Sequence, residues 1–331
     1  KVFYTNSGSE ANDTMVKMLW FLSGSEDQPQ RRKILTRKNA YHGVTAVSAS
    51  MTGKPYNEVF GLPLDGFIHL TCPHYWREGH AGESETDFTA RMAQEMEDVI
   101  AREGSETIAA FFAEPVMGAG GVIPPSDGYF QAIQPILRKH GIPLIADEVI
   151  CGFGRTGAVW GCETYDFTPD AIISSKNLTA GYFPMGAVIL GPEMTDRLQA
   201  ASNAIEEFPH GFPASGHPVG CAVALKAIDV ILNEGLIENV RALTPKFEAG
   251  LNWLAENPHI GEARGKGLMG AVEAVRDKAS KTPFEAHLSV SERIANTCTD
   301  HGLICRPLGQ AVVLCPAFVM TEAQMDEMFN N

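Results

Sequence analysis

The sequence of 331 residues lacks several features that mark other classes of protein. It contains no Cys-x-x-Cys pair, and its seven cysteines are scattered along the chain and odd in number. This pattern argues against a disulfide framework or a zinc site and favours reduced thiols. No run approaches the ~18 apolar residues of a membrane span, and no signal peptide is visible. We therefore expect a cytoplasmic protein without a metal site or a membrane partner.

Positive charge is also scarce. The chain has 26 Lys and Arg against 40 Asp and Glu, which gives a formal net charge of −14. A general affinity for nucleic acid phosphates requires clustered Lys and Arg. We therefore expect no nucleic acid partner, and we look for small-molecule ligands instead.

Compact apolar runs recur through the first two thirds of the chain. They do not alternate polar with apolar residues, so they predict strands buried on both faces, as in a parallel sheet. Helical patterns at 88–103 and 128–140 lie between them, which is an α/β layer pattern. The predicted strands are 108–113, 142–146, 171–173 and 186–190.

The last third has a different pattern. A long helical pattern begins at Pro218 and another follows at 236–256, after which short strands and one helix at 286–301 are predicted. We predict a large cofactor-binding domain over 1–217, and a connecting helix with a smaller C-terminal α+β domain over 218–331. The chain starts at Lys1 without a methionine and stops at Asn331 inside a helical pattern. We therefore expect both ends to be incomplete. The short strands predicted here are 268–275, 303–307 and 311–316.

The strongest chemical signal lies between Asp147 and Lys176. Asp147 ends an apolar strand, where open α/β sheets place their ligand crevice. Lys176 follows another short strand among small residues, which leave room for a ring and a substrate beside a lysine that forms a Schiff base. An acid near a pyridine nitrogen keeps it protonated, so that the ring accepts electrons. Each residue alone has an ordinary alternative, a turn cap for Asp147 and a solvated surface lysine for Lys176.

Gly152–Gly157 formally matches the dinucleotide fingerprint G-x-G-x-x-G. However, 158–163 is a poor helix start, and no acidic residue ends a second strand about 20 positions later. This match therefore does not predict a dinucleotide site.

A second candidate for ligand binding is the start of the first helix. Ser7, Gly8 and Ser9 precede a helical pattern, and Ser9 is a suitable N-cap residue. Free backbone N–H groups and the positive end of the helix dipole would form a phosphate cradle there. An ordinary N-cap without a ligand is the alternative.

Two loops contribute further candidates. Tyr41 and His42 follow the strand 33–36, and an aromatic ring there could stack on a flat cofactor. Glu114 ends the strand 108–113 and could face the same crevice. Packing for Tyr41 and an ion pair for Glu114 remain open as structural alternatives.

In this order, these motifs resemble the class III aminotransferases, the ω-transaminases among the fold-type I pyridoxal-phosphate enzymes. The resemblance runs through the whole chain, and the segment from Asp147 to Lys176 is its most specific part. The motifs that carry it are 7-SGSEA-11, 41-YHG-43, Glu114-Pro115, 147-DEV-149, Gly152–Gly157, Lys176, 210-HGFPASGHP-218 and Arg306.

The resemblance implies a role for each of these residues, with pyridoxal 5'-phosphate as the cofactor. Lys176 would be the Schiff-base lysine and the proton shuttle, and Asp147 would bind the ring nitrogen. Val149 and Tyr41 would cover the two ring faces, while Gly8 and Ser9 would bind the phosphate. Ser7, His42 and Glu114 complete the predicted cofactor site. Arg306 would pair with the substrate carboxylate, which a guanidinium fork binds bidentately.

Two positions depart from the family pattern. Pro213 replaces a threonine in the segment that a partner subunit offers to the cofactor phosphate, and Asn177 stands where a small or apolar residue is expected. The family also has a further N-terminal segment that supplies part of the substrate pocket and of the dimer interface. The resemblance thus implies a homodimer with its active site at the subunit interface.

The function implied is amino transfer from an amine or an ω-amino acid to a small keto acid such as pyruvate. One alternative is a glutamate-semialdehyde-type aminomutase, which transfers the amino group within one molecule on the same scaffold. The other is a degenerate protein that binds pyridoxal phosphate without catalysis.

Overall fold

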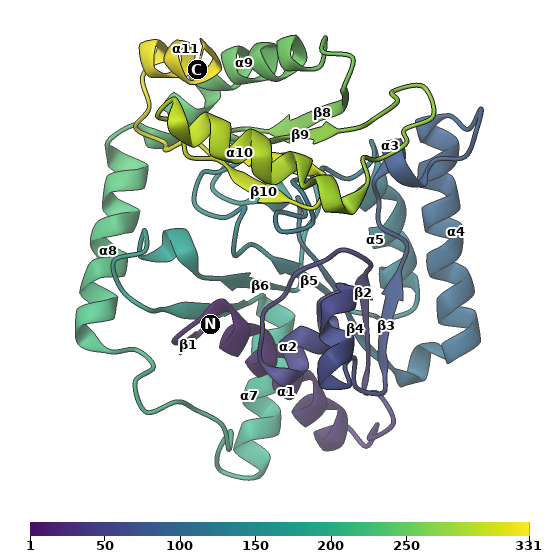
Figure 1. Ribbon diagram of the computed structural model, residues 1–331. Helices are drawn as coiled ribbons and strands as arrows, with labels where there is room; N and C mark the ends of the chain where they lie inside the picture. Colours follow the sequence, from purple (N-terminus) through teal and green to yellow (C-terminus); the bar gives the residue numbers. More distant parts are fainter. Residues whose placement is uncertain (331) are drawn as a thin grey trace.

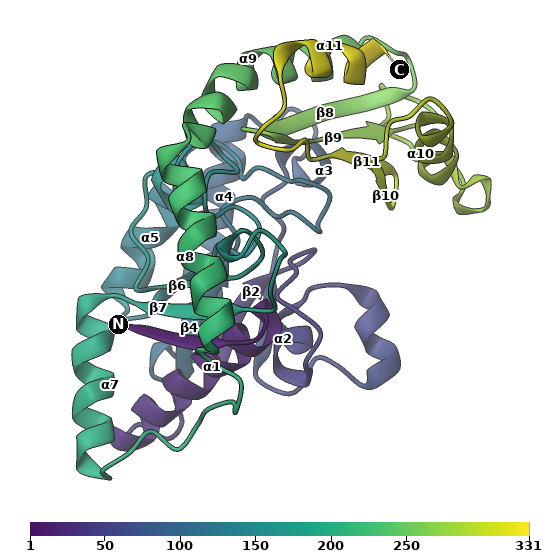
Figure 2. The same cartoon turned by 90° about the vertical axis from the view of Figure 1, so that its left-hand side faces the viewer.

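The computed structural model describes residues 1–330, which form two sheets linked by the long helix α8 (Pro218–Asn233) (Figure 1). The seven-stranded sheet lies within the first 190 residues, and the four-stranded sheet lies beyond residue 260. Figure 2 shows α8 running along the first sheet toward the second, where α9 (Leu236–Leu254) continues the path.

The elements of the first part have the following bounds. The strands are β1 (Val2–Thr5), β2 (Lys33–Arg37), β3 (Phe67–Leu70), β4 (Ile108–Ala113), β5 (Leu144–Asp147), β6 (Ala171–Ser174) and β7 (Gly186–Leu190). The helices are α1 (Gly8–Ser25), α2 (Ala46–Met51), α3 (Tyr75–Glu78), α4 (Glu85–Glu103), α5 (Tyr129–Lys139), α6 (Gly161–Thr164) and α7 (Pro192–Ala204).

The large sheet is mainly parallel and has helices on both faces. Its order is β1-β7-β6-β5-β4-β2-β3, in which β7 runs antiparallel to both of its neighbours. Because successive residues of a strand point to opposite faces, Phe112 packs with α1 and α7 while Phe111 packs with α4 and α5. Both faces are thus apolar, which explains why these strands do not alternate polar with apolar residues.

The second part has an antiparallel sheet covered by helices. Its strands are β8 (Ile260–Lys266), β9 (Met269–Ala274), β10 (Arg306–Leu308) and β11 (Ala311–Leu314), in the order β10-β11-β9-β8. The helices are α9, α10 (Val290–Asp300) and α11 (Glu322–Asn330). The two sheets fall on either side of residue 217, and the domain boundary itself stays a prediction.

The structure confirms the α/β class and corrects several details. Strands β1, β3 and β8 were not predicted, and β10 begins at Arg306 rather than at 303. Strand β8 has the sequence IGEARGK, and its polar residues are half-buried against other polar groups, so it has no apolar pattern to detect. Among residues 1–330, no helix combines the length and the apolar character needed to cross a membrane.

Candidate active site

The predicted site residues come together at one edge of the large sheet. Asp147 ends β5, Glu114 directly follows β4, Lys176 follows β6, and Tyr41 lies four residues beyond β2. These four strands are parallel, so their carboxyl ends meet at the same edge. They surround a cavity of about 190 Å³, lined by Gly8, Ser9, Tyr41, His42, Gly43, Glu114, Asp147, Val149, Ile150, Ser175 and Lys176.

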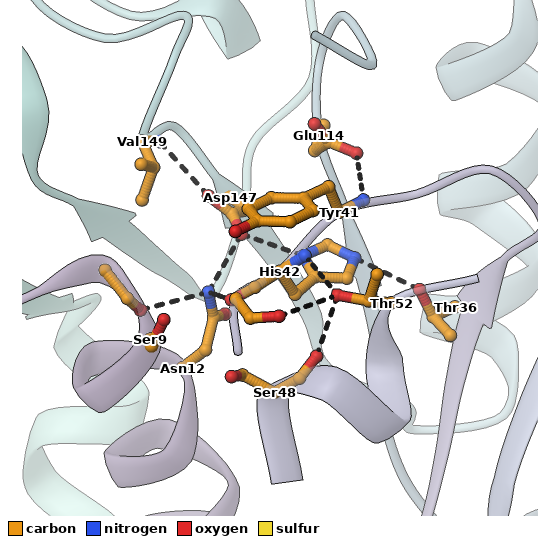
Figure 3. A network of polar contacts seen from close by, with 12 residues as sticks. Ser9, Asn12, Thr36, Tyr41, His42, Ser48, Thr52, Glu114, Asp147 and Val149 are labelled. Atoms are coloured by element: carbon orange, nitrogen blue, oxygen red, sulfur yellow. Dashed lines mark hydrogen bonds and ion pairs between the residues drawn. The ribbon is translucent and has the colours of Figure 1, made fainter. Parts of the chain in front are cut away.

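Asp147 is the centre of a buried hydrogen-bond network (Figure 3). Its side chain is 3% exposed. Its Oδ2 accepts hydrogen bonds from His42 Nδ1 at 2.7 Å and from Asn12 Nδ2 at 2.9 Å. Its Oδ1 accepts one from the backbone N–H of Val149 at 3.1 Å. These donors satisfy the hydrogen-bonding needs of a buried carboxyl group.

The same network leaves one acceptor position of Asp147 available. A carboxylate oxygen has two lone pairs, and Oδ2 already receives two donors whereas Oδ1 receives one. Asp147 lines the cavity, so the remaining position suits an N–H donor bound there. The hydrogen bond from Val149 N shows that Asp147 also closes a local turn. Asp147 can therefore both cap this turn and accept a hydrogen bond from a ligand.

His42 is fixed by contacts on both ring nitrogens. Its Nδ1 donates to Asp147, so its Nε2 is free to accept a hydrogen bond from the Thr36 hydroxyl, 3.1 Å away. The ring also meets Phe112 edge to face, with ring centroids 6.3 Å apart. His42 therefore orients the Asp147 carboxylate from behind the cavity.

Glu114 forms no ion pair with a basic side chain among residues 1–330. Its two carboxylate oxygens accept from the backbone N–H groups of Tyr41, at 3.0 Å, and Gly118, at 3.2 Å. Burial raises the pKa of this carboxyl group above its ordinary value, while nearby His42 opposes that shift. Glu114 thereby holds the Tyr41 loop against the cavity.

Lys176 stands at the mouth of the cavity in a strained conformation. Its φ of 41° lies in the left-handed region, which is rare for residues other than glycine and is concentrated at functional sites. Although the residue is exposed in the single chain, desolvation by surrounding protein lowers the pKa of its amine. The carboxylates of Asp147 and Glu114 oppose this shift. A lysine with a lowered pKa is more often neutral and hence nucleophilic.

The start of α1 offers backbone donors to the cavity. The prediction that Ser9 is the N-cap is wrong, because the N-cap is Ser7, two residues earlier, whose hydroxyl accepts from Glu10 N at 3.1 Å. Ser9 Oγ instead accepts from Val44 N at 3.1 Å. Within residues 1–330, the N–H groups of Gly8 and Ser9 have no hydrogen-bond partner. A Cβ on Gly8 would lie 3.0 Å from a methyl group of Val149, so only glycine keeps this space open.

Three predicted residues lie outside the cavity lining. Ser7 caps α1 without reaching the cavity, and Pro213 lies exposed in the loop between α7 and α8. Arg306 is exposed at the start of β10, and it forms no ion pair within residues 1–330. Its positive charge nevertheless contributes to the lowered pKa of Lys176, so it lies on the same side of the molecule.

Sequence reasoning missed Asn12, whose amide connects several parts of the site. It lies four residues after Gly8 on the same face of α1, and it is fully buried. Its Nδ2 contacts Asp147 Oδ2, the His42 carbonyl at 2.8 Å and the Gly8 carbonyl at 3.2 Å. A polar residue on the buried stripe of a helix was the signal that could have identified it.

The residues fit pyridoxal phosphate. An aromatic nitrogen that carries a proton would find the open acceptor of Asp147, and a phosphate would find the unpartnered N–H groups of Gly8 and Ser9. Lys176 would supply the amine. The assignment of individual residues to the cofactor stays a prediction.

Comparison with known proteins gives matches along the entire chain. Residues 1–331 match the family Aminotransferase class-III. Gamma aminobutyrate transaminase 3, chloroplastic, from Solanum lycopersicum is 44% identical over 329 residues, covering 99% of this chain and 63% of the relative. Gamma aminobutyrate transaminase 1, mitochondrial, from the same plant is 45% identical over 99% of this chain and 64% of its own length. The chain therefore spans less than two thirds of these curated relatives.

Solved structures of similar proteins agree with this match. The PMP-bound form of an aminotransferase from Vibrio fluvialis has a TM-score of 0.99 and 77% identity, covering 100% of this chain and 73% of that one. An omega-aminotransferase from Paracoccus denitrificans has the same TM-score and identity, with 100% and 74% covered. The fold is thus that of the fold-type I pyridoxal-phosphate enzymes, and the chain belongs to the class III aminotransferase family.

Proposed function

We propose that the protein is a pyridoxal-phosphate-dependent aminotransferase that moves an amino group from an amine or ω-amino acid to a small keto acid such as pyruvate. The observation that carries the proposal is the meeting of Lys176, Asp147 and the open N–H groups of α1 around one cavity. When bound, pyridoxal phosphate supplies an aldehyde for amines and an electron-accepting ring.

The large domain would hold the cofactor by its two ends. The N–H groups of Gly8 and Ser9 and the dipole of α1 favour the phosphate. Asp147, oriented by His42 and Asn12, keeps a proton on the ring nitrogen. Val149 and Tyr41 line the same cavity and would exclude water from the ring faces.

Lys176 would have two tasks. Its amine would hold the cofactor covalently between turnovers, and its neutral form would carry a proton to and from the substrate. Desolvation by the surrounding protein favours that neutral form, because it lowers the pKa of the amine. Its position beside Ser175 at the end of β6 directs the amine to the cavity.

Two observations support the proposed substrates, namely the positive charge of Arg306 and the names of the similar proteins. Arg306, at the start of β10, is a cation without an ion-pair partner among residues 1–330, which suits it to a carboxylate. The curated relatives are named for γ-aminobutyrate, and the solved structure from Paracoccus denitrificans is called an omega-aminotransferase, which favours donors with an amine far from any carboxylate. Pyruvate is the acceptor that we propose to test first.

A half-reaction assay tests this function on full-length protein. With pyridoxal phosphate bound, an added amine should change the absorbance of the cofactor, and pyruvate should restore it. Absence of both changes would contradict the proposal and favour a non-catalytic binding protein. Turnover of a single amino aldehyde without any keto acid would instead indicate intramolecular transfer.

Assembly and location complete the proposal. We infer a homodimer in which the segment 210–218 of one subunit reaches the active site of the other. This segment is largely exposed in the single chain, as such a role requires. A cytoplasmic location, favoured by seven cysteines that are all free, stays a prediction.

A further inference from the structure

Glu148 lies between two residues of the cofactor cavity, but its side chain does not line that cavity. The residue is 1% exposed. Its Oε1 accepts from the backbone N–H of Cys162 at 2.7 Å, and its Oε2 accepts from that of Gly161 at 2.9 Å. Burying a carboxylate costs free energy unless hydrogen bonds compensate for the lost hydration. Here two backbone N–H groups provide that compensation, so the position of Glu148 is tied to the position of residues 161 and 162.

These bonds close a long loop. The chain leaves the sheet at Asp147, passes through 149–160, and returns at Gly161 to the carboxylate of Glu148. Gly161 fits tightly, because an added Cβ would lie 2.8 Å from the Cβ atoms of both Cys151 and Pro115. The far end of the loop is therefore fixed beside Pro115, which follows Glu114 of the cavity.

The near end of the same loop forms one wall of the cavity, through Val149 and Ile150. Within the loop, Gly152 N donates to Glu148 O at 2.8 Å, and Phe153 N donates to Val159 O at 2.6 Å. The side chain of Glu148 thus joins the two ends of this loop. A change at Glu148 is therefore expected to shift the part of the cavity wall that Val149 and Ile150 form.

We propose that Glu148 is a positioning residue whose two-acceptor carboxylate holds the loop 149–160 so that Val149 and Ile150 form the wall of the cofactor cavity. This inference rests on the proposed function, because the position of this wall affects binding only if pyridoxal phosphate occupies the cavity. Glu148 itself touches neither cofactor nor substrate.

A carboxylate is needed because both partners are donors. Glutamine offers only one acceptor oxygen, so its NH₂ group would face a backbone N–H and leave that N–H without a partner. An unpartnered buried donor costs about 1–3 kcal/mol, which corresponds to about a tenfold to hundredfold change in an equilibrium constant.

A matched control for Glu148 is Glu163, a second glutamate that accepts a backbone hydrogen bond near the end of the loop. Glu163 accepts a hydrogen bond from Trp160 N at 3.0 Å, but Glu163 is exposed and does not return to the strand that carries Asp147. Glu163→Gln makes the same chemical change in α6, directly after the loop, without breaking the closure of the loop.

Titration of Glu148 supplies a second test. Burial raises the pKa of Glu148 to about 7, the N–H groups of Cys162 and Gly161 oppose this shift, and Asp147 adds to it. The titratable neighbours are Asp147, Cys151 and Cys162. Because this pKa is raised above its ordinary 4.5, protonation stabilises the folded protein relative to the unfolded chain by removing a buried charge, but a protonated carboxyl group no longer offers both oxygens as acceptors to the two N–H groups. That stabilisation is complete below about pH 4.5 and is lost as the pH rises through about 7.

The first experiment titrates full-length apo-protein with pyridoxal phosphate and follows tryptophan fluorescence. Glu148→Gln should raise the Kd about tenfold or more, whereas Glu163→Gln should leave it unchanged. If Glu148→Gln lowers the Tm but keeps the parental Kd, the residue is only structural and the proposal is overturned. Glu148→Asp, too short to reach both N–H groups, should also raise the Kd if the glutamine variant does not fold.

The second experiment needs no cofactor. The emission of Trp160, taken as the difference between the parent and Trp160→Phe, should change with a midpoint near pH 7. The change should persist in Glu163→Gln and vanish in Glu148→Gln, which has no titratable group at this position, and its persistence in Glu148→Gln would overturn the link between Glu148 and the loop. If the parent binds no pyridoxal phosphate, the proposed function fails, but this measurement still decides whether Glu148 anchors the loop.

Discussion

The proposed cofactor end of the site, around Asp147, and its proposed substrate end, at Arg306, are built in different ways. At the cofactor end, Asp147 is almost fully buried and receives three hydrogen bonds from within the chain. At the substrate end, Arg306 is exposed on β10 and has no ion-pair partner within residues 1–330.

This difference has a physical origin. A buried carboxylate must be hydrogen-bonded, so the residues that fix Asp147 have to be present in the fold itself. An exposed guanidinium keeps its hydration and can remain without a partner until a carboxylate arrives. We therefore expect cofactor chemistry to depend on single buried residues, and substrate choice to depend on weaker contacts at the surface.

The largest expected effect is at Lys176. Lys176→Ala should lower kcat by at least about 10⁴-fold, because the proton transfer and the covalent attachment are both lost. The protein should still bind pyridoxal phosphate through the phosphate cradle. Borohydride reduction of the parent followed by peptide mapping should place the cofactor on Lys176, and attachment to another lysine would contradict the assignment. Lys139→Ala, exposed on α5, serves as the control.

The next effect tests the buried carboxylate. Asp147→Asn should lower kcat by about 10²–10³-fold, since an amide cannot stabilise the proton on the ring nitrogen as a carboxylate does. Circular dichroism should show an intact fold, because the amide oxygen still accepts hydrogen bonds. Asp229→Asn on the exposed face of α8 provides the control. Near-normal activity in Asp147→Asn would mean that Asp147 is only a turn cap. The cofactor end would then not depend on a single buried residue.

The cofactor end was largely predictable from the sequence, for reasons visible in the structure. Strands β4, β5 and β6 are apolar on both faces, so their boundaries, and with them Glu114, Asp147 and Lys176, could be located. All three lie at the carboxyl ends of neighbouring parallel strands, which the topology of α/β folds brings together.

Other features had no comparable signal. Asn12 acts through tertiary contacts, so its place on the buried stripe of α1 could indicate burial but not its partners His42 and Asp147. Strand β8 is half-buried along its whole length and has no alternation. The N-cap was placed at Ser9 rather than Ser7 because serine occurs at both positions, and only backbone geometry separates them.

A smaller effect is expected at the substrate end. A hydrogen-bonded charge pair contributes about 1.5–3 kcal/mol, so Arg306→Ala should raise the KM for pyruvate by about ten- to a hundredfold. Amines without a carboxylate should be affected much less in their own half-reaction. Arg276→Ala, also exposed in the second part of the chain, is the control. Equal losses for both kinds of substrate would show that Arg306 is structural and that the two ends are not separate.

The smallest expected effect concerns Pro213, in the segment that we propose reaches the cofactor end of a second subunit. Proline offers neither a hydroxyl nor a backbone N–H, whereas threonine offers both, so Pro213→Thr should bind pyridoxal phosphate up to about tenfold more tightly. The gain should be modest because Gly8, Ser9 and the dipole of α1 already provide donors. It should appear only in the dimer and be largest for the pyridoxamine form, which has no covalent bond to Lys176. Titration of apo-protein at concentrations above and below dimer dissociation would measure it, with Pro209→Thr in the same loop as the control. Equal Kd values for Pro213→Thr and the parent would mean that the segment 210–218 does not reach the phosphate, and that one chain builds the whole cofactor end.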